Sequence, residues 1–242
     1  MDEGVVHISW WGIALSLLPV LAVGLIFQRW NSGGRLLGYA TFRMLIQLIA
    51  VGFVLIFVFE NESAWLGLAI LALVLGVSSW IAMRPLARKG PGQYGLILFS
   101  LAVSGIAVLA LVLWVVIGLD PMYQPRYFIP LTGMIFANAM NAISLAGERF
   151  ETDRKSTDYR HARNAAFNAA MIPQINSFLA VGLVSLPGMM TGQILSGVSP
   201  LEAVRYQIVV MNMILGSAGL AVAIYLCGQW RNEEERTSGV QA

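Results

Sequence analysis

Long apolar runs dominate this chain and restrict what it can fold into. Seven of them reach about twenty residues or more, and an α-helix of that length spans the ~30 Å hydrocarbon core of a bilayer. Only 12% of the residues are charged, about half of the fraction found in soluble domains. The sequence therefore predicts an all-α, polytopic integral membrane protein with about seven transmembrane helices, at residues 9–28, 36–59, 64–83, 93–118, 127–147, 166–186 and 203–229.

The basic residues alternate between connections, and this pattern predicts the orientation of the chain. Twelve lysines and arginines fall in the first, third and fifth connections and in the tail, whereas Arg126 and Arg205 fall in the others. Because cytoplasmic segments of membrane proteins retain Lys and Arg, we expect the N-terminus outside and the C-terminus in the cytoplasm. The acidic start, with Asp2 and Glu3, predicts that no signal peptide is cleaved. We expect a multi-pass protein of the cell inner (plasma) membrane.

The chain has no linker rich in Pro, Gly or Ser and no clear repeat. We therefore expect one transmembrane domain over residues 1–242. Its longest hydrophilic stretch lies in a predicted cytoplasmic loop, 148–168, and a predicted cytoplasmic tail follows at 230–242.

A break in the apolar pattern precedes the last predicted helix. Pro187 and Gly188 interrupt an apolar segment, and a proline there removes a backbone hydrogen bond, so we expect an outer turn or short re-entrant piece at 186–199. Ser199, Pro200 and Glu202 have the spacing of a capping box, which predicts the start of a long final helix.

Several chemistries are excluded by what the sequence lacks. The only lysines, Lys89 and Lys155, do not follow the glycine-spaced run of a phosphate-binding loop, so this chain has no ATPase motif of its own. The single Cys227 excludes an internal disulfide, and His7 and His161 lie outside the apolar runs. We expect no catalytic residues and no enzyme activity, and energy for transport would come from another subunit or an ion gradient.

Polar residues within the apolar runs are the candidates for a substrate pathway. Each group shares a helix face or lies close together on one helix, and each could instead serve helix packing or, for the arginine, reach the cytoplasmic interface. The candidates are Arg43 and Gln47 in the second run, Asn138 and Asn141 in the fifth, and Gln174, Asn176 and Ser177 in the sixth.

Two further groups are candidates for binding. Met189 and Met190 carry adjacent thioethers, which hold soft metal ions but also fill apolar gaps. The predicted cytoplasmic loop carries a cluster of cations that predicts a partner-binding surface, although a solvated connector has the same pattern. These cations are Arg149, Arg154, Lys155, Arg160 and Arg163.

The order of these motifs resembles the FetB family of permeases from iron-export ABC transporters, which are related to plant permeases of aluminium tolerance. The resemblance runs from about residue 36 to 225. Its most specific part is the Ser-Leu-Pro-Gly-Met-Met block, and it is carried by Arg43–Gly52, Ile129–Met134 with Asn138 and Asn141, Val181–Gly192 and the Arg-Tyr-Gln-Ile that begins at Arg205.

This resemblance implies a permease that pairs with a separate cytoplasmic ATP-binding subunit, as two copies of each. ATP would be bound by the partner, this chain would bind no cofactor, and iron or another metal would be the cargo. Two features depart from the family. The 148–168 loop is shorter and lacks a Leu-Gly-Ala coupling segment, and an Asp and a Lys of the usual pattern are replaced by Asn176 and Leu179.

The sequence thus leads to three hypotheses. The first is the permease of an ABC-type metal transporter that works by alternating access. The second is a FetB-derived membrane protein without ATPase coupling, which would act as a passive channel, receptor or scaffold. The third is an ion-coupled carrier, which the apolar runs disfavour because they contain no carboxylate.

Overall fold

The computed structural model describes residues 8–30, 34–60, 63–121 and 123–239, with side chains described as far as Trp230. Asp2, Glu3 and His7 therefore lie outside the described residues, as do residues 240–242 at the end of the predicted tail. The chain forms two compact units, Met1–Asn61 and Glu62–Ala242, and each is described by itself.

The first unit is a helical hairpin. Helices α1 (Trp10–Ser16) and α2 (Leu18–Arg29) follow each other, and α3 (Gly34–Glu60) contacts α2. The break at Leu17 comes just before Pro19, which has no N–H to donate and is favoured in the first turn of a helix. The first two predicted transmembrane segments, 9–28 and 36–59, are confirmed as helices of membrane-spanning length.

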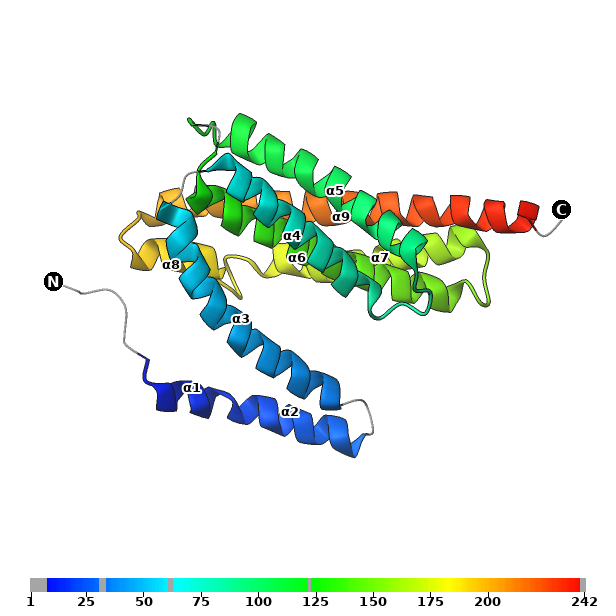
Figure 1. Ribbon diagram of the computed structural model, residues 1–242, viewed down its shortest axis with the longest axis horizontal. Coiled ribbons are helices and arrows are strands. Elements are labelled where there is room, and N and C mark those ends of the chain that lie inside the picture. Colours follow the sequence, from blue (N-terminus) through cyan, green and yellow to red (C-terminus); the bar gives the residue numbers. More distant parts are fainter. Residues whose placement is uncertain (1–7, 31–33, 61–62, 122, 240–242) are drawn as a thin grey trace. The chain divides into compact units, whose positions relative to one another are not determined.

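The second unit is a bundle of long helices that run alternately between two ends (Figure 1). Its elements are α4 (Ala64–Met83), α5 (Pro91–Ala110) with a π-helical continuation η1 (Leu111–Val116), α6 (Pro125–Asp153), α7 (Tyr159–Ala180), the short α8 (Gly188–Leu195) and α9 (Pro200–Gly239).

Helix α6 is the centre of this bundle, because α4, α5, α7 and α9 all pack against it. Small side chains on neighbouring turns make this close approach possible. On α7 the buried face is a stripe of three alanines four residues apart, Ala162, Ala166 and Ala170. At Gly105 on α5, an added Cβ would collide with the buried ring of Phe136 on α6. Small residues at these positions therefore let the helices of the bundle pack closely.

Within the described residues, six helical segments are long and apolar enough to cross a membrane. The sixth predicted segment, 166–186, is absent from them and was placed too far along the chain, because α7 begins at Tyr159 and ends at Ala180. The first turns of α7 carry charged and polar side chains, so the helix as a whole is not apolar enough to count as membrane-spanning. Its 22 residues still extend ~33 Å, and α7 runs back between the two ends that α6 joins (Figure 1).

The helix break also differs from the prediction. Pro187 does not interrupt a helix: α7 has already ended, Gly182 turns the chain with φ 87°, and Pro187 is the N-cap of α8. The expected short piece on this side is thus an eight-residue helix. The predicted start of the last helix is confirmed, since α9 begins at Pro200 and the Glu202 N–H donates to Ser199 Oγ at 3.4 Å.

Candidate functional site

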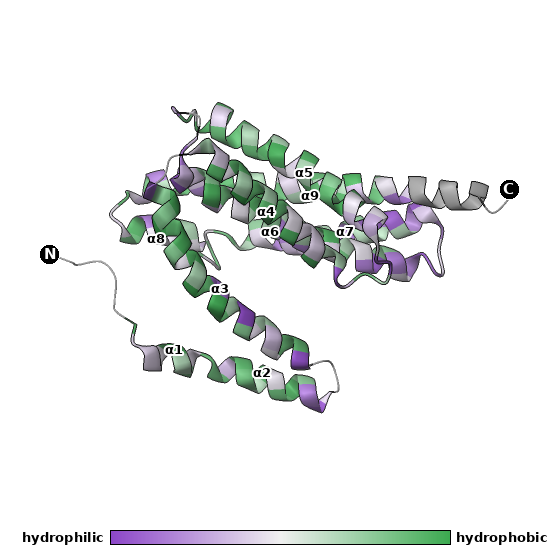
Figure 2. Cartoon of the chain, in the orientation of Figure 1, coloured by the Kyte–Doolittle hydropathy of each residue, from purple (hydrophilic) through white to green (hydrophobic). Residues whose placement is uncertain are grey.

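The two basic connections of the bundle lie at the same end, which we call the predicted cytoplasmic end. Hydrophilic residues gather there, where α6 turns into α7 beside the later part of α9 (Figure 2). The carboxylate of Glu151 on α6 joins the two connections, because it accepts the backbone N–H of Ala87 at 2.6 Å and of Arg88 at 3.0 Å. One side chain therefore fixes the α4–α5 connection against the α6–α7 turn.

The predicted loop 148–168 is mostly helical. Helix α6 extends to Asp153 and α7 begins at Tyr159, so only five residues form the turn. Arg149 pairs with Asp153 at 2.8 Å, and Arg154 Nη1 donates to Thr157 O at 2.9 Å. Of these two predicted partner-binding cations, Arg154 closes the turn and Arg149 is paired within the last turns of α6, while the side chain of Lys155 is exposed.

A hydrogen-bonded network lies inside the bundle near the same end. Gln93 Nε2 on α5 donates to the hydroxyl of Tyr225 at 2.6 Å, and Gln229 Nε2 donates to Oε1 of Gln93 at 3.1 Å. Tyr225 and Gln229 on α9 are both buried. Because each polar group in such a place needs a partner, this network specifies how α5 and α9 meet.

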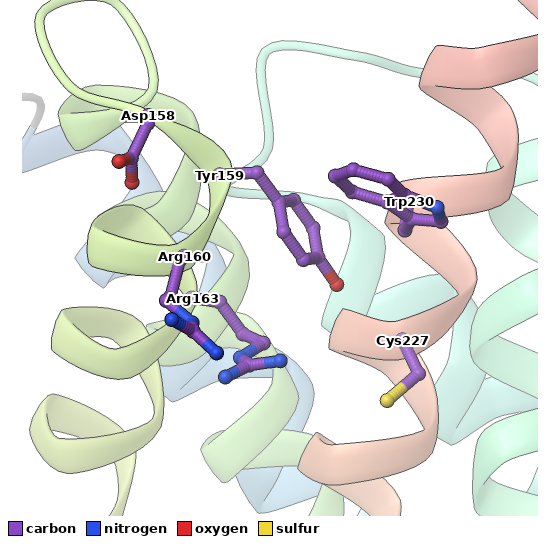
Figure 3. Close-up of a pocket in the computed structure, with 6 residues that line it drawn as sticks. All are labelled: Asp158, Tyr159, Arg160, Arg163, Cys227 and Trp230. Atoms are coloured by element: carbon purple, nitrogen blue, oxygen red, sulfur yellow. The ribbon is translucent and has the colours of Figure 1, made fainter.

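The other two predicted cations, Arg160 and Arg163, line a cavity of about 540 Å³ between the start of α7 and residues 227–230 of α9 (Figure 3). Tyr159 and Trp230 meet edge to face in its lining, with ring centroids 4.7 Å apart. The guanidinium of Arg163 lies 5.8 Å from the Tyr159 ring, and Cys227 also lines the cavity.

Asp158 forms part of the rim of this cavity. Its carboxylate caps α7 by accepting the His161 N–H at 2.8 Å and also contacts His161 Nδ1 at 2.9 Å. Hydrogen bonds from His161 lower the pKa of this exposed carboxyl below its usual value. The negative charge is thus already engaged with the helix start.

A second cavity, of about 290 Å³, lies at the opposite end between the last turn of α7, α8 and α9. Its lining is mainly apolar, but it includes Met190 from α8 and Met211, Gln207 and Asn212 from α9. Gln207 is only 5% exposed, and its Oε1 has no hydrogen-bond partner in the described part of the chain. The polar groups in the lining of this cavity are therefore neutral thioethers and amides. We call it the outer cavity.

The structure separates the two adjacent methionines that the sequence singled out. Met190 lines the outer cavity, whereas Met189 packs against the core of the bundle. Among the described residues, no group of three or more His, Cys, Asp or Glu side chains could hold a metal ion. Any metal bound in the outer cavity would therefore rely on neutral ligands.

The two predicted pathway residues on α6 differ in their surroundings. Asn138 is half-buried and donates to Met134 O at 2.9 Å, so part of its hydrogen-bonding capacity is used within its own helix. Asn141 is exposed. The two amides therefore do not form a common buried polar group.

The remaining predicted pathway residues are only partly buried. On α7, Gln174 is buried but Asn176 and Ser177 are exposed. On α3 of the first unit, Arg43 is half-buried and Gln47 is exposed. Within the bundle, Gln174 is thus the predicted pathway residue that the interior most clearly encloses.

Sequence reasoning missed the residues that define both ends of the bundle. Gln93 begins the apolar run predicted at 93–118 and Gln207 lies near the start of the one at 203–229, and an amide in such a run is the signal by which they could have been found. Glu151 was one acidic residue in a mixed-charge stretch. Nothing in its local sequence indicates that it bonds to a segment more than sixty residues away.

Comparison with known proteins gives a consistent family. A family described as "Uncharacterised protein family (UPF0014)" matches residues 8–160 and 153–232. The chain is 34% identical to UPF0014 membrane protein slr1647 of Synechocystis, over 98% of this chain and 99% of that protein. It is 36% identical to Protein ALUMINUM SENSITIVE 3 of Arabidopsis thaliana, over 78% and 74% of the two chains.

A third relative carries a name that states a transport activity. The chain is 33% identical to the Escherichia coli protein named "Probable iron export permease protein FetB", and the similarity covers 76% of each chain. No solved structure matches the chain with comparable significance.

Proposed function

This chain belongs to the UPF0014 family of multi-pass membrane proteins, and we propose that it is the permease subunit of an ABC-type transporter that moves a metal cation or metal complex. The observation that carries the proposal is the 33% identity, over 76% of each chain, to the protein named as an iron export permease. A separate cytoplasmic subunit would bind and hydrolyse ATP, and two permease copies would assemble with two such subunits.

The predicted cytoplasmic end supplies the surface on which we place this ATP-binding subunit. The α4–α5 connection and the α6–α7 turn both border a cavity of about 180 Å³, which includes Arg88, Glu151 and Lys155. Because Glu151 on α6 bonds to the α4–α5 connection, we expect a displacement of either segment to move α6 together with α4 and α5. This joined surface would replace the longer coupling segment typical of the FetB family.

For the cargo, we propose passage through the outer cavity. Met190, Met211 and Gln207 offer two soft sulfur atoms and one oxygen, a neutral set that binds a transition-metal cation weakly. Weak binding suits transport, because a cation that is held too tightly does not leave.

Co-purification and ATP turnover test the subunit role. The tagged permease should recover an ATP-binding subunit, and metal should stimulate ATP hydrolysis when both are reconstituted in proteoliposomes. Arg88→Gln combined with Lys155→Gln should reduce the recovery, because both side chains are exposed at the joined surface. Arg149→Gln is the matched control, since Arg149 is paired with Asp153. If no ATP-binding subunit is recovered and hydrolysis stays at background, the ABC assignment fails.

Metal binding by the purified permease tests the cargo route. Met190→Leu with Met211→Leu should weaken binding of a soft metal ion, measured by calorimetry, whereas Met189→Leu should leave it unchanged because Met189 packs on the core. Equal binding by the unsubstituted permease and both variants would limit the methionines to packing.

The alternative is a FetB-derived membrane protein without ATPase coupling, such as a channel, receptor or scaffold. The observation that favours it is the short α6–α7 turn, which is closed by its own hydrogen bonds from Arg154 and Thr157. A metal flux through proteoliposomes that contain the permease alone, and that does not respond to ATP, would select this alternative.

A further inference from the structure

We propose that the cavity between the start of α7 and residues 227–230 of α9 binds the phosphate group of an anionic phospholipid. The cavity is the one lined by Arg160, Arg163, Tyr159, Cys227 and Trp230 (Figure 3). This proposal requires only that the chain lies in a membrane, so it does not depend on the ABC assignment.

The position of the cavity places it at the level of the lipid headgroups. The apolar run of the last helix ends in the sequence at Trp230, because charged residues begin at Arg231, and α7 begins at Tyr159 beside Trp230. Trp and Tyr are enriched at the boundary between hydrocarbon and water, where one side of the ring is apolar and the other is wet. Figure 2 shows the change from hydrophobic to hydrophilic residues at this same end.

The charges of the cavity favour an anion. Two guanidinium groups line it against the single carboxylate of Asp158, which is engaged by the start of α7 and by His161. Arg163 is oriented by Asn164 Oδ1, which accepts from its Nε and Nη2 at 3.2 and 3.1 Å. Arginine forks match the oxygen atoms of a phosphate group. The two arginines of the lining therefore carry more positive charge than the single carboxylate of Asp158 neutralises.

The size and the walls of the cavity favour a lipid headgroup over a bare ion. Its volume of about 540 Å³ is within the range that holds small organic ligands. The rings of Tyr159 and Trp230 form an apolar wall next to the arginines, so a ligand with both a phosphate and an attached apolar part uses the whole cavity. Basic pockets between transmembrane helices on the cytoplasmic side bind anionic headgroups in this way.

Cys227 provides a reporter at the site itself. It is the only cysteine in the chain, it is exposed, and it lines the cavity. The rate at which a neutral maleimide labels Cys227 can be measured on the permease alone in phosphatidylcholine vesicles, with and without phosphatidylglycerol. A bound headgroup should slow the labelling. Arg160→Gln and Arg163→Gln should each lower the apparent affinity for phosphatidylglycerol about fivefold, and Arg149→Gln should not change it.

The controls distinguish headgroup binding from a general effect of the charged membrane surface. An anionic surface lowers local pH and slows thiol reactions generally, but that effect persists in the arginine variants, whereas specific protection disappears. Inorganic phosphate added to phosphatidylcholine vesicles tests a free anion as the ligand. Three outcomes would each overturn the proposal. The labelling rate could be equal in both vesicle types, the protection could survive both arginine substitutions, or inorganic phosphate could protect Cys227 equally well.

Discussion

Glu151 joins the two connections at the predicted cytoplasmic end, and its replacement by glutamine tests whether it does so energetically. The carboxylate accepts two backbone N–H groups, from Ala87 and Arg88. A hydrogen bond to a charged group contributes ~1.5–3 kcal/mol and a neutral one ~0.5–1.5 kcal/mol. In Glu151→Gln, the amide side chain would keep one neutral acceptor and point its NH₂ group at the other N–H. Because water reaches this surface and replaces part of the loss, we expect a destabilisation of about 2 kcal/mol.

Thermal unfolding in detergent and hydrogen exchange at residues 85–90 measure this loss. For a chain of this size, about 2 kcal/mol lowers the Tm by ~4–8 °C, and the amide protons of Ala87 and Arg88 should exchange faster. Glu148→Gln is the matched control, since Glu148 lies on the same helix and is exposed. If Glu151→Gln and Glu148→Gln have the same Tm and the same exchange rates, the carboxylate does not hold the two connections together.

Three more outcomes follow from the described contacts. Gly105→Ala should destabilise the protein by ~1–3 kcal/mol because its methyl group would overlap Phe136, whereas Gly133→Ala, with open space around it, should not. Equal Tm values for the two variants would contradict this. Ser199→Ala should cost ~0.5–2 kcal/mol by removing the cap of α9, and unchanged exchange at the first turn of α9 would refute this. The Asp158 carboxyl that caps α7 has a lower pKa in the folded protein than its ordinary value of 3.8. Its contribution to stability should therefore be complete above pH 3.8 and be lost as the pH falls through the lower folded pKa, and Asp158→Ala should remove this pH dependence of unfolding.

The membrane character and most helix bounds could be predicted because hydropathy is a property of the local sequence. The segment 64–83 coincides with α4, and Ser199 and Pro200 mark the start of α9. Helix α7 was misplaced for a physical reason. Its first turns carry Arg160, His161 and Arg163, whereas the apolar residues 181–186 follow its end, so the apolar run extends past the helix. The buried alanine stripe of α7 packs within the bundle, and this packing is not visible in the hydropathy of the sequence.

The candidate site was less predictable because it depends on contacts between distant segments. The sequence singled out Met189 and Met190 together, yet neighbouring positions on a helix point in different directions, and only Met190 lines the outer cavity. Its companions Met211 and Gln207 come from α9. The resemblance to a family singled out the methionine motif, but it could not assign the side of the helix on which each thioether lies.

The distribution of charge in the bundle limits what kind of transport it can perform. No Asp, Glu, Lys or Arg occurs in residues 64–83, 91–116, 127–147 or 206–230. A cation that crosses between these helices meets only neutral ligands, so the bundle cannot neutralise its charge in the hydrocarbon region. Under the proposed function, the cargo would therefore cross as a complex that carries its own anions, or in a water-filled path opened by conformational change. The joined surface around Glu151 is where we propose that the ATP-binding subunit drives this change.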